Sequence, residues 1–125
     1  MEKNNVSESV QRESMIRAMI KVYQKDEENK IIGADLADFS IPPQVNGHIP
    51  DIVVKTPESY VLLEAETCGS IDTDKTKLQL TTLHNYAAQN NIRFDMVIPK
   101  SCLDKVNKKL SELNISAKIW SAANF

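Results

Sequence analysis

Apolar residues recur along the chain at two different spacings, which separate the expected helices from the expected strands. A spacing near 3.6 residues predicts a helix capped by Ser7 or Ser9 that ends in the charged run KDEENK. It predicts two more helices, over residues 75–89 and 103–113, the last capped by Ser101. Short apolar runs predict strands over residues 31–39, 51–55, 60–66, 92–99 and 115–120. The order α-β-β-β-α-β-α-β indicates a mixed α/β domain.

A tight reversal at Pro57 joins the second and third strands, because proline pre-sets φ for position i+1 of a type I turn. A hairpin centred just after Pro57 pairs residues whose numbers sum to 115, so Asp51 faces Glu64. Side chains alternate along a strand, so Glu66 shares the face of Glu64 and Asp51. The spacing therefore predicts three carboxylates on one patch at one end of the hairpin.

Carboxylates in that arrangement favour a bound divalent cation. Like charges placed directly opposite one another are destabilising, and a cation between them removes the conflict. Oxygen ligands of this kind suit Mg²⁺ or Mn²⁺, to which the carbonyl of residue 65 could add a further ligand. Such an ion can polarise a phosphoryl oxygen and generate hydroxide from bound water. We therefore expect Mg²⁺ or Mn²⁺ at Asp51, Glu64 and Glu66.

Length and charge restrict the classes of protein. The 125 residues predict one domain over residues 1–125, and 42% hydrophobic with 26% charged residues is typical of a soluble globular chain. The net charge of −2 argues against a protein that holds nucleic acid by bulk electrostatics. Residues 1–70 carry a balance of −5 and residues 71–125 one of +3. That asymmetry suits a metal site beside a phosphate-bearing substrate, although an ordinary scatter of surface charge explains it equally well.

The N-terminus and the cysteines favour a cytoplasmic protein. The start MEKNNVSESVQRE has no secretory signal, and no apolar run has the length of a membrane span. Cys68 and Cys102 have no metal-ligand spacing with each other or with the two histidines. Their expected state is that of reduced packing residues and not of a disulfide.

The chain resembles the PD-(D/E)XK nuclease superfamily at Pro50-Asp51 and at Glu64-Ala65-Glu66, where Glu66 stands in the position of the family's lysine. The surrounding elements are also similar, and the resemblance covers nearly the whole chain. It implies a restriction-endonuclease-like or Holliday-junction-resolvase-like core, α-β-β-β-α-β, with a further helix and a C-terminal strand, and a mixed sheet flanked by helices. It further implies a metal-dependent DNA endonuclease, acting on single-stranded, double-stranded or branched DNA. The weak net charge and the small size indicate that a homodimer or a partner protein completes the DNA-binding surface.

The resemblance also implies roles for further residues. The first helix often supplies another acid, which would be Glu13 or, alternatively, Glu8, and a glutamine on the following helix would be Gln79. With glutamate in the lysine position, three readings stay open. Glu66 can be a second metal ligand or general base, Lys75 or Lys77 can reach back to supply the positive charge, or catalysis can have been lost.

Three other readings remain. His48 precedes the acids and could touch substrate, although a turn histidine bonded to backbone is the commoner case. A non-catalytic relative of the same fold would act as a DNA- or protein-binding module. A glycosidase is less attractive, because it needs two acids flanking a sugar cleft, and aromatic residues are few.

Overall fold

The computed structural model describes residues 7–122 of the chain, and the order of its helices and strands is the one the sequence predicts. Ser7 caps the first helix, since its side chain accepts a hydrogen bond from the Val10 amide. Ser101 is not a cap: it lies in a short 3₁₀ turn, and Cys102 is the residue that precedes the third helix. The elements are α1 (Glu8–Gln24), β1 (Lys30–Ala34), β2 (Ile52–Lys55), β3 (Tyr60–Ala65), η1 (Ser70–Asp72), α2 (Asp74–Gln89), β4 (Arg93–Pro99), η2 (Lys100–Cys102), α3 (Leu103–Leu113) and β5 (Lys118–Ala122).

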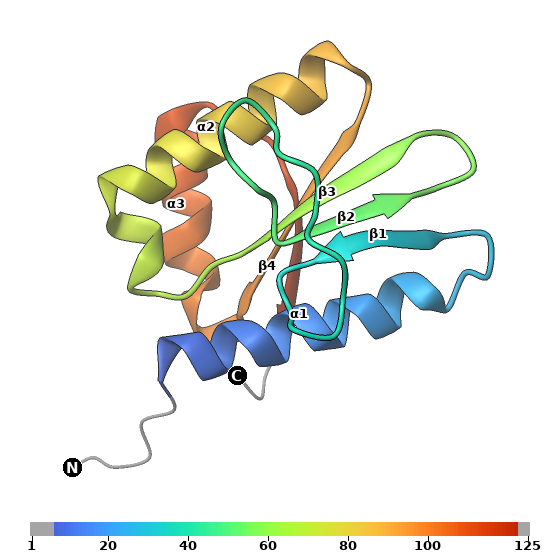
Figure 1. Ribbon diagram of the computed structural model, residues 1–125. Helices are drawn as coiled ribbons and strands as arrows, with labels where there is room; N and C mark the ends of the chain where they lie inside the picture. The colour runs from blue at the N-terminus through green and yellow to red at the C-terminus, as the bar shows by residue number, and fades with distance from the viewer. Residues whose placement is uncertain (1–6, 123–125) are drawn as a thin grey trace.

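One mixed sheet of five strands, in the order β1-β2-β3-β4-β5, forms the centre of the fold (Figure 1). The strands β1, β2 and β3 run antiparallel, while β3, β4 and β5 run parallel. The change occurs after β3 because α2 and α3 carry the chain back before β4 and β5 begin. β3 is therefore the central strand, with one antiparallel and one parallel neighbour.

The pairing of β2 with β3 is the predicted one. Ile52 lies opposite Leu63 and Lys55 lies opposite Tyr60, so the paired residue numbers sum to 115. The Thr56 amide donates to the Ser59 carbonyl at 3.0 Å and closes the reversal. This register determines which side chains of β2 and β3 point to each face of the sheet.

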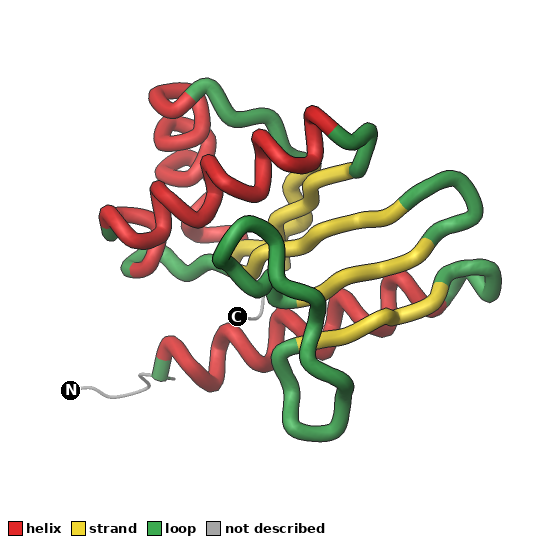
Figure 2. Tube along the Cα trace, turned by 45° about the horizontal axis from the view of Figure 1, so that its top comes forward, coloured by secondary structure: helices red, strands yellow, loops and turns green. Residues whose placement is uncertain are grey.

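Helices cover both faces of the sheet, and each face has its own apolar layer (Figures 1 and 2). α1 lies on one face, and α2 and α3 lie on the other. The layer under α1 includes Met15, Ile16, Met19, Ile20, Tyr23, Ile52, Val54, Val61, Leu63, Ala65 and Val97. The layer under α2 and α3 includes Val53, Leu62, Leu80, Leu83, Phe94, Met96, Ile98, Val106 and Leu110. Residues 52–54 and 61–63 alternate between the two layers, as side chains do along paired strands.

The strand expected over residues 31–39 is shorter than predicted, because β1 ends at Ala34. The chain turns there, with the Leu36 amide bonded to the Ala34 carbonyl and the Ala34 amide bonded to the Ser40 carbonyl. The register shifts between Ile31 and Gly33, as at a β-bulge. Because Gly33 has no side chain, the backbone of residues 40–42 comes close: a Cβ at Gly33 would lie 2.7 Å from the Pro42 nitrogen. The connection over residues 35–51 then folds back across the sheet (Figure 2).

A buried carboxylate connects α1 with the last two strands. Asp95 on β4 has no exposed surface. It accepts hydrogen bonds from Tyr23 Oη at 2.7 Å, Trp120 Nε1 at 2.9 Å, and Arg93 Nε and Nη2 at 2.9 and 3.0 Å. Burial, and then the negative charge of Asp95, raises the pKa of Tyr23 above its usual range. The network therefore joins α1, β4 and β5 through one carboxylate.

Cys68 and Cys102 form a disulfide, so the prediction of reduced cysteines is wrong. β3 and β4 are adjacent and parallel, and the segments that follow them leave the sheet at the same edge. This brings the two Cα atoms to 5.3 Å, although the residues are 34 positions apart in sequence. The cysteines therefore no longer support a cytoplasmic location. Across residues 7–122, no helix combines the length and apolar character of a membrane span.

Candidate functional site

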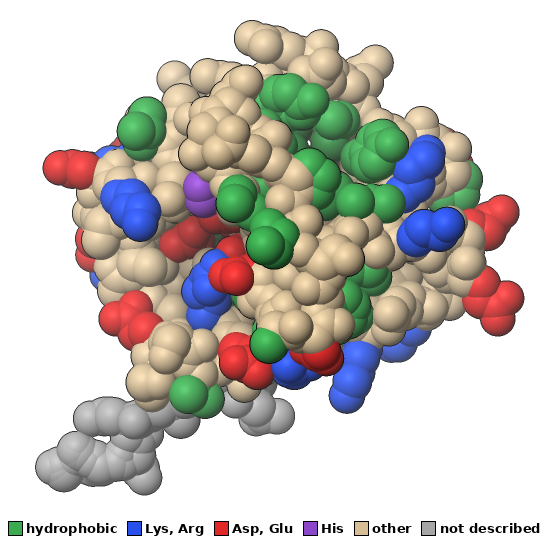
Figure 3. Space-filling model, viewed as in Figure 1, with side chains coloured by type: hydrophobic (Ala, Val, Ile, Leu, Met, Phe, Trp, Pro, Cys, Tyr) green, Lys and Arg blue, Asp and Glu red, His purple; other side chains and the backbone are tan. Residues whose placement is uncertain are grey.

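A pocket of about 660 Å³ opens at the end of β3 where the chain leaves the sheet. Its walls come from α1, from the connection over residues 35–51, from the ends of β2 and β3, and from the start of α2. Figure 3 shows acidic side chains in this hollow, with basic and histidine side chains beside them. The pocket therefore lies at the end of the central strand, which has an antiparallel neighbour on one side and a parallel neighbour on the other.

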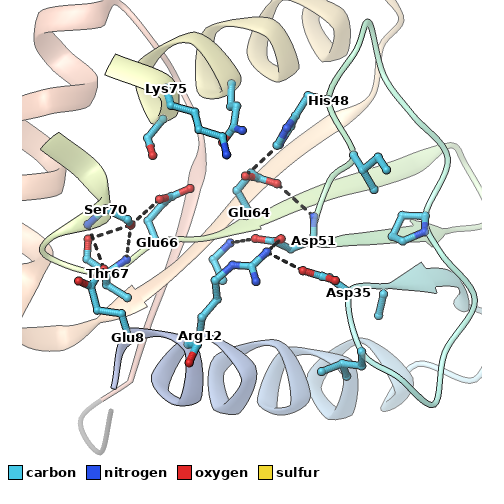
Figure 4. A pocket seen from close by; sticks show the side chains of 18 of the residues that line it. Glu8, Arg12, Asp35, His48, Asp51, Glu64, Glu66, Thr67, Ser70 and Lys75 are labelled. Carbon is cyan, nitrogen blue, oxygen red and sulfur yellow. Dashed lines mark hydrogen bonds and ion pairs between the residues drawn. The ribbon is translucent and has the colours of Figure 1, made fainter. Parts of the chain in front are cut away.

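Three buried carboxylates lie in the pocket: Asp51, Glu64 and Glu66, with 3%, 2% and 4% of their surfaces exposed. The Asp51 amide donates to Glu64 Oε1 at 3.1 Å, and Asp51 Oδ2 accepts from the Ala65 amide at 2.8 Å (Figure 4). Glu64 thus binds the backbone amide of Asp51, and Asp51 binds the backbone amide that follows Glu64. The hairpin register brings these three side chains together, as the sequence predicts.

Glu66 is held by the loop that follows β3. The Ser70 hydroxyl donates to Glu66 Oε1 at 2.6 Å, and the Thr67 amide donates to Ser70 Oγ at 2.8 Å. The Thr67 hydroxyl donates to a carboxylate oxygen of Glu8, which comes from the first turn of α1. This loop fixes the third carboxylate and links it to α1.

Burial is the main influence on the ionisation of these acids. It raises the pKa of Asp51 to about 6, against the lowering effect of the Arg12 cation. It raises the pKa of Glu66 to about 7, against the Ser70 hydrogen bond. Burial, followed by the charges of Asp51 and Glu66, raises the pKa of Glu64 well above its usual range. The cluster therefore carries too little positive charge nearby to keep three carboxylates ionised at neutral pH.

Arg12 is the cation closest to the cluster. Its guanidinium on α1 binds Asp51 and also Asp35, the latter at 2.9 Å. The sequence did not identify Arg12 or Asp35 as site residues. Arg12 and Asp51 are 39 positions apart, and only the packing of α1 against the sheet makes them neighbours. The helical position of Arg12, one turn after Glu8 on the same face, is the signal that could have identified it.

Lys75 and His48 stand across the pocket from Arg12 (Figure 4). His48 Nε2 lies 3.2 Å from Glu64 Oε2, although the contact lacks the geometry of a hydrogen bond. Burial lowers the pKa of His48, and the positive charges of Lys75 and Arg12 lower it further. His48 is therefore the neutral imidazole at neutral pH, and not a cation paired with Glu64.

The other residues selected from the sequence divide into two groups. Lys75, Gln79 and His48 line the pocket together with the three acids. Glu13 and Lys77 do not line it: Glu13 is exposed and pairs with Arg17 at 3.2 Å, and Lys77 pairs with Asp74 at 3.6 Å. On α1 the acid that reaches the pocket is Glu8, the alternative to Glu13. The three-to-four-residue helical period places Glu8 and Arg12 on one face and Glu13 away from it.

Within residues 7–122, no group of three or more histidine, cysteine or acidic side chains is arranged to hold a metal ion as it stands. Protein donors occupy several of the carboxylate oxygens: Arg12 and the Ala65 amide bind Asp51, and Ser70 binds Glu66. The donor set nevertheless fits a hard divalent cation, because buried carboxylates with raised pKa values lack compensating charge. Mg²⁺ needs only one or two protein carboxylates and keeps its waters.

Comparison with known proteins gives a match in structure. Pyrococcus furiosus SfsA, solved in complex with Ca²⁺, superposes with a TM-score of 0.52 and 12% sequence identity over 87% of this chain and 53% of that one. The chain spans about half the length of that protein. No protein-family model and no curated protein matches the sequence. The comparison shows that the α/β fold, with its mixed sheet of five strands flanked by helices, is SfsA-like.

Proposed function

We propose that the protein is a divalent-metal-dependent deoxyribonuclease of the PD-(D/E)XK type, which hydrolyses phosphodiester bonds in the pocket at the end of β3. The observation that carries this proposal is the convergence of three buried carboxylates and Lys75 in one open pocket. The SfsA-like fold adds support, because the similar structure was solved with a divalent cation, Ca²⁺. That residues 1–125 act as one domain is part of the same proposal.

Asp51 and Glu64 would hold the metal, Mg²⁺ or Mn²⁺, with Glu66 beside them. When bound, the ion would polarise a phosphoryl oxygen and lower the pKa of a bound water. Arg12 would have to leave Asp51 Oδ1, and its second contact, to Asp35 at 2.9 Å in this structure, would keep it at the pocket. Glu66, whose pKa is raised to about 7, can accept a proton at neutral pH and is our proposed general base.

The positive charge that glutamate cannot supply at position 66 would come from Lys75. It lines the pocket from the first turn of α2, whereas Lys77 pairs with Asp74 outside it. Lys75 would stabilise the charge that develops on the phosphate. Gln79, one turn further along the same helix face, would orient substrate or a water. A net charge of −2 provides little attraction for DNA, so we propose that a second copy or a partner protein completes the DNA-binding surface.

Cleavage of plasmid, single-stranded and branched DNA with Mn²⁺ or Mg²⁺ tests the proposal. Asp51→Asn and Glu64→Gln should each abolish cleavage, and Lys75→Ala should lower its rate about 100-fold. Glu58→Gln is the matched control, because Glu58 lies exposed at the opposite end of the same hairpin. Cleavage that survives both acid substitutions would reject the site.

A second candidate is a binding module without catalysis. The hydrogen bonds of Asp51 and Glu66 to Arg12 and Ser70 favour it, because they satisfy the acids without an ion. Calorimetry with Mg²⁺ and Mn²⁺ separates the two functions. A chain that binds neither ion and cleaves no DNA, yet retains DNA in a gel-shift assay, would be the module.

A further inference from the structure

A two-residue turn holds His48 over the end of β3. The Val45 amide donates to the His48 carbonyl at 2.7 Å, and the His48 amide donates to the Val45 carbonyl at 3.0 Å. Asn46 and Gly47 lie between them with φ of 47° and 90°, and a type I′ turn requires positive φ at both positions. Val45 is buried in the layer under α2 and α3, which anchors the turn. The backbone therefore fixes the position of the imidazole.

A ring nitrogen of His48 and a carboxylate oxygen of Glu64 face each other at this point. His48 Nε2 is buried and has no hydrogen-bond partner within residues 7–122. It lies 3.2 Å from Glu64 Oε2, while Oε1 of the same carboxylate accepts the Asp51 amide (Figure 4). A buried polar atom without a partner is costly, and native proteins contain few of them. The arrangement indicates a partner that the nitrogen and the oxygen share.

The separation of the two atoms is that of neighbouring metal ligands. Imidazole nitrogen and carboxylate oxygen bind Zn²⁺ at about 2.0–2.2 Å. Two such ligands lie about 3.0 Å apart at a right angle and about 3.4 Å apart at the tetrahedral angle. The observed 3.2 Å falls between these values. A single ion can therefore be bound by both atoms with little movement of either side chain.

We propose that His48 Nε2 and Glu64 Oε2 bind the same divalent cation as adjacent ligands, and that His48 makes the site select a later transition-metal ion over Mg²⁺. This inference rests on the proposed function, which places a cation at the same carboxylates. Imidazole favours ions such as Co²⁺ and Zn²⁺, whereas an all-oxygen site suits Mg²⁺. His48 thus has a role that the sequence did not suggest: it determines which metal binds.

Calorimetry of the full chain with Co²⁺ alone and with Mg²⁺ alone tests the proposal. His48→Ala should weaken Co²⁺ binding about tenfold or more and change Mg²⁺ binding by less than about threefold. His84→Ala is the matched control, because His84 lies on α2 with Nδ1 3.3 Å from the Ser116 carbonyl, outside the pocket. Both cysteines are in the disulfide, so no thiol competes for Co²⁺.

Proton NMR of the Co²⁺-loaded wild-type chain gives a readout that needs no substitution. A metal-bound imidazole should give a strongly shifted, solvent-exchangeable N–H signal, which His48→Asn should remove and His84→Ala should keep. Co²⁺ binding without that signal, and with unchanged affinity in His48→Ala, would overturn the role of His48 and leave the carboxylate site intact. A wild-type chain that binds neither ion would overturn both proposals.

Discussion

Replacing Asp95 with alanine would measure how strongly one buried carboxylate stabilises the fold. Asp95 has no exposed surface and accepts four hydrogen bonds, from Tyr23, Trp120 and two nitrogens of Arg93. A hydrogen bond to a charged group contributes roughly 1.5–3 kcal/mol, and a buried donor left unpaired costs roughly 1–3 kcal/mol. The energetic cost of losing this acceptor, however, differs among the three donor side chains.

Exposure decides the expected size of the effect. The Arg93 side chain is 47% exposed and can turn to water after the substitution. Trp120 is half-buried and can also reach solvent, whereas Tyr23 is only 4% exposed and leaves a buried hydroxyl unpaired. The loss of Asp95 also removes the cost of burying a charge. We therefore expect Asp95→Ala to lower the free energy of unfolding by about 3 kcal/mol, near the lower end for a broken buried pair.

Urea denaturation at pH 7, without reducing agent, measures this loss. Tyr23→Phe should lower the free energy of unfolding by about 1.5–2 kcal/mol, because it removes one of the four hydrogen bonds to the carboxylate. Asp38→Ala is the control: Asp38 pairs with Arg17 on the surface with 60% of its side chain exposed, so its loss should cost less than about 1 kcal/mol. If Asp95→Ala costs no more than Asp38→Ala, the network is not a source of stability and the reasoning fails.

Two further predictions concern the pocket, and a third concerns the packing of β1 against the segment around Pro42. In the presence of a metal chelator, the free energy of unfolding should fall as pH rises from 4.5 to about 7, because the folded chain holds a proton on Glu66 that the unfolded chain releases. The expected loss over this range is about 3 kcal/mol. Urea denaturation at pH 5 and 8 should show a shallower fall for Glu66→Gln, and equal falls would contradict the assignment. Arg12→Gln should raise the pKa of Asp51 above about 6, because the substitution removes the cation that lowers this pKa. Carbon NMR titration of the Asp51 carboxyl measures the change, and an unchanged pKa would argue against the ion pair. Gly33→Ala should lower the free energy of unfolding by about 1–3 kcal/mol, because the new Cβ meets the Pro42 backbone. Gly69→Ala should cost less, since its Cβ meets the flexible Glu8 side chain. Similar losses in urea unfolding would show that the segment around Pro42 moves away from the new side chain.

The order of the elements and the hairpin register were predictable because they depend on local patterns. Pro57 fixes the reversal, and the alternation of residues 52–54 with residues 61–63 then assigns every side chain to a face. The convergence of the three acids follows from that register. The end of the first strand was less predictable, because β1 stops where Gly33 allows the backbone near Pro42 to approach.

The partners of the acids could not be read from the sequence. Arg12 reaches Asp51 across 39 positions, and Tyr23 reaches Asp95 across 72, because helix α1 packs against the sheet. Nothing in the sequence around Asp95 separates a fully buried carboxylate from an exposed one in an edge strand. Such contacts depend on how elements pack and not on their own periodicity.

The disulfide between Cys68 and Cys102 means that the pocket wall depends on whether the protein is oxidised or reduced. Cys68 lies in the segment that carries Thr67 and Ser70, and Cys102 lies at the start of α3. Dithiothreitol would remove the crosslink between this segment and the helix, and we expect the hydrogen bond from Ser70 to Glu66 to remain. Samples prepared with and without reductant would therefore differ in this wall of the pocket. A thiol count belongs beside every affinity or rate measured for this chain.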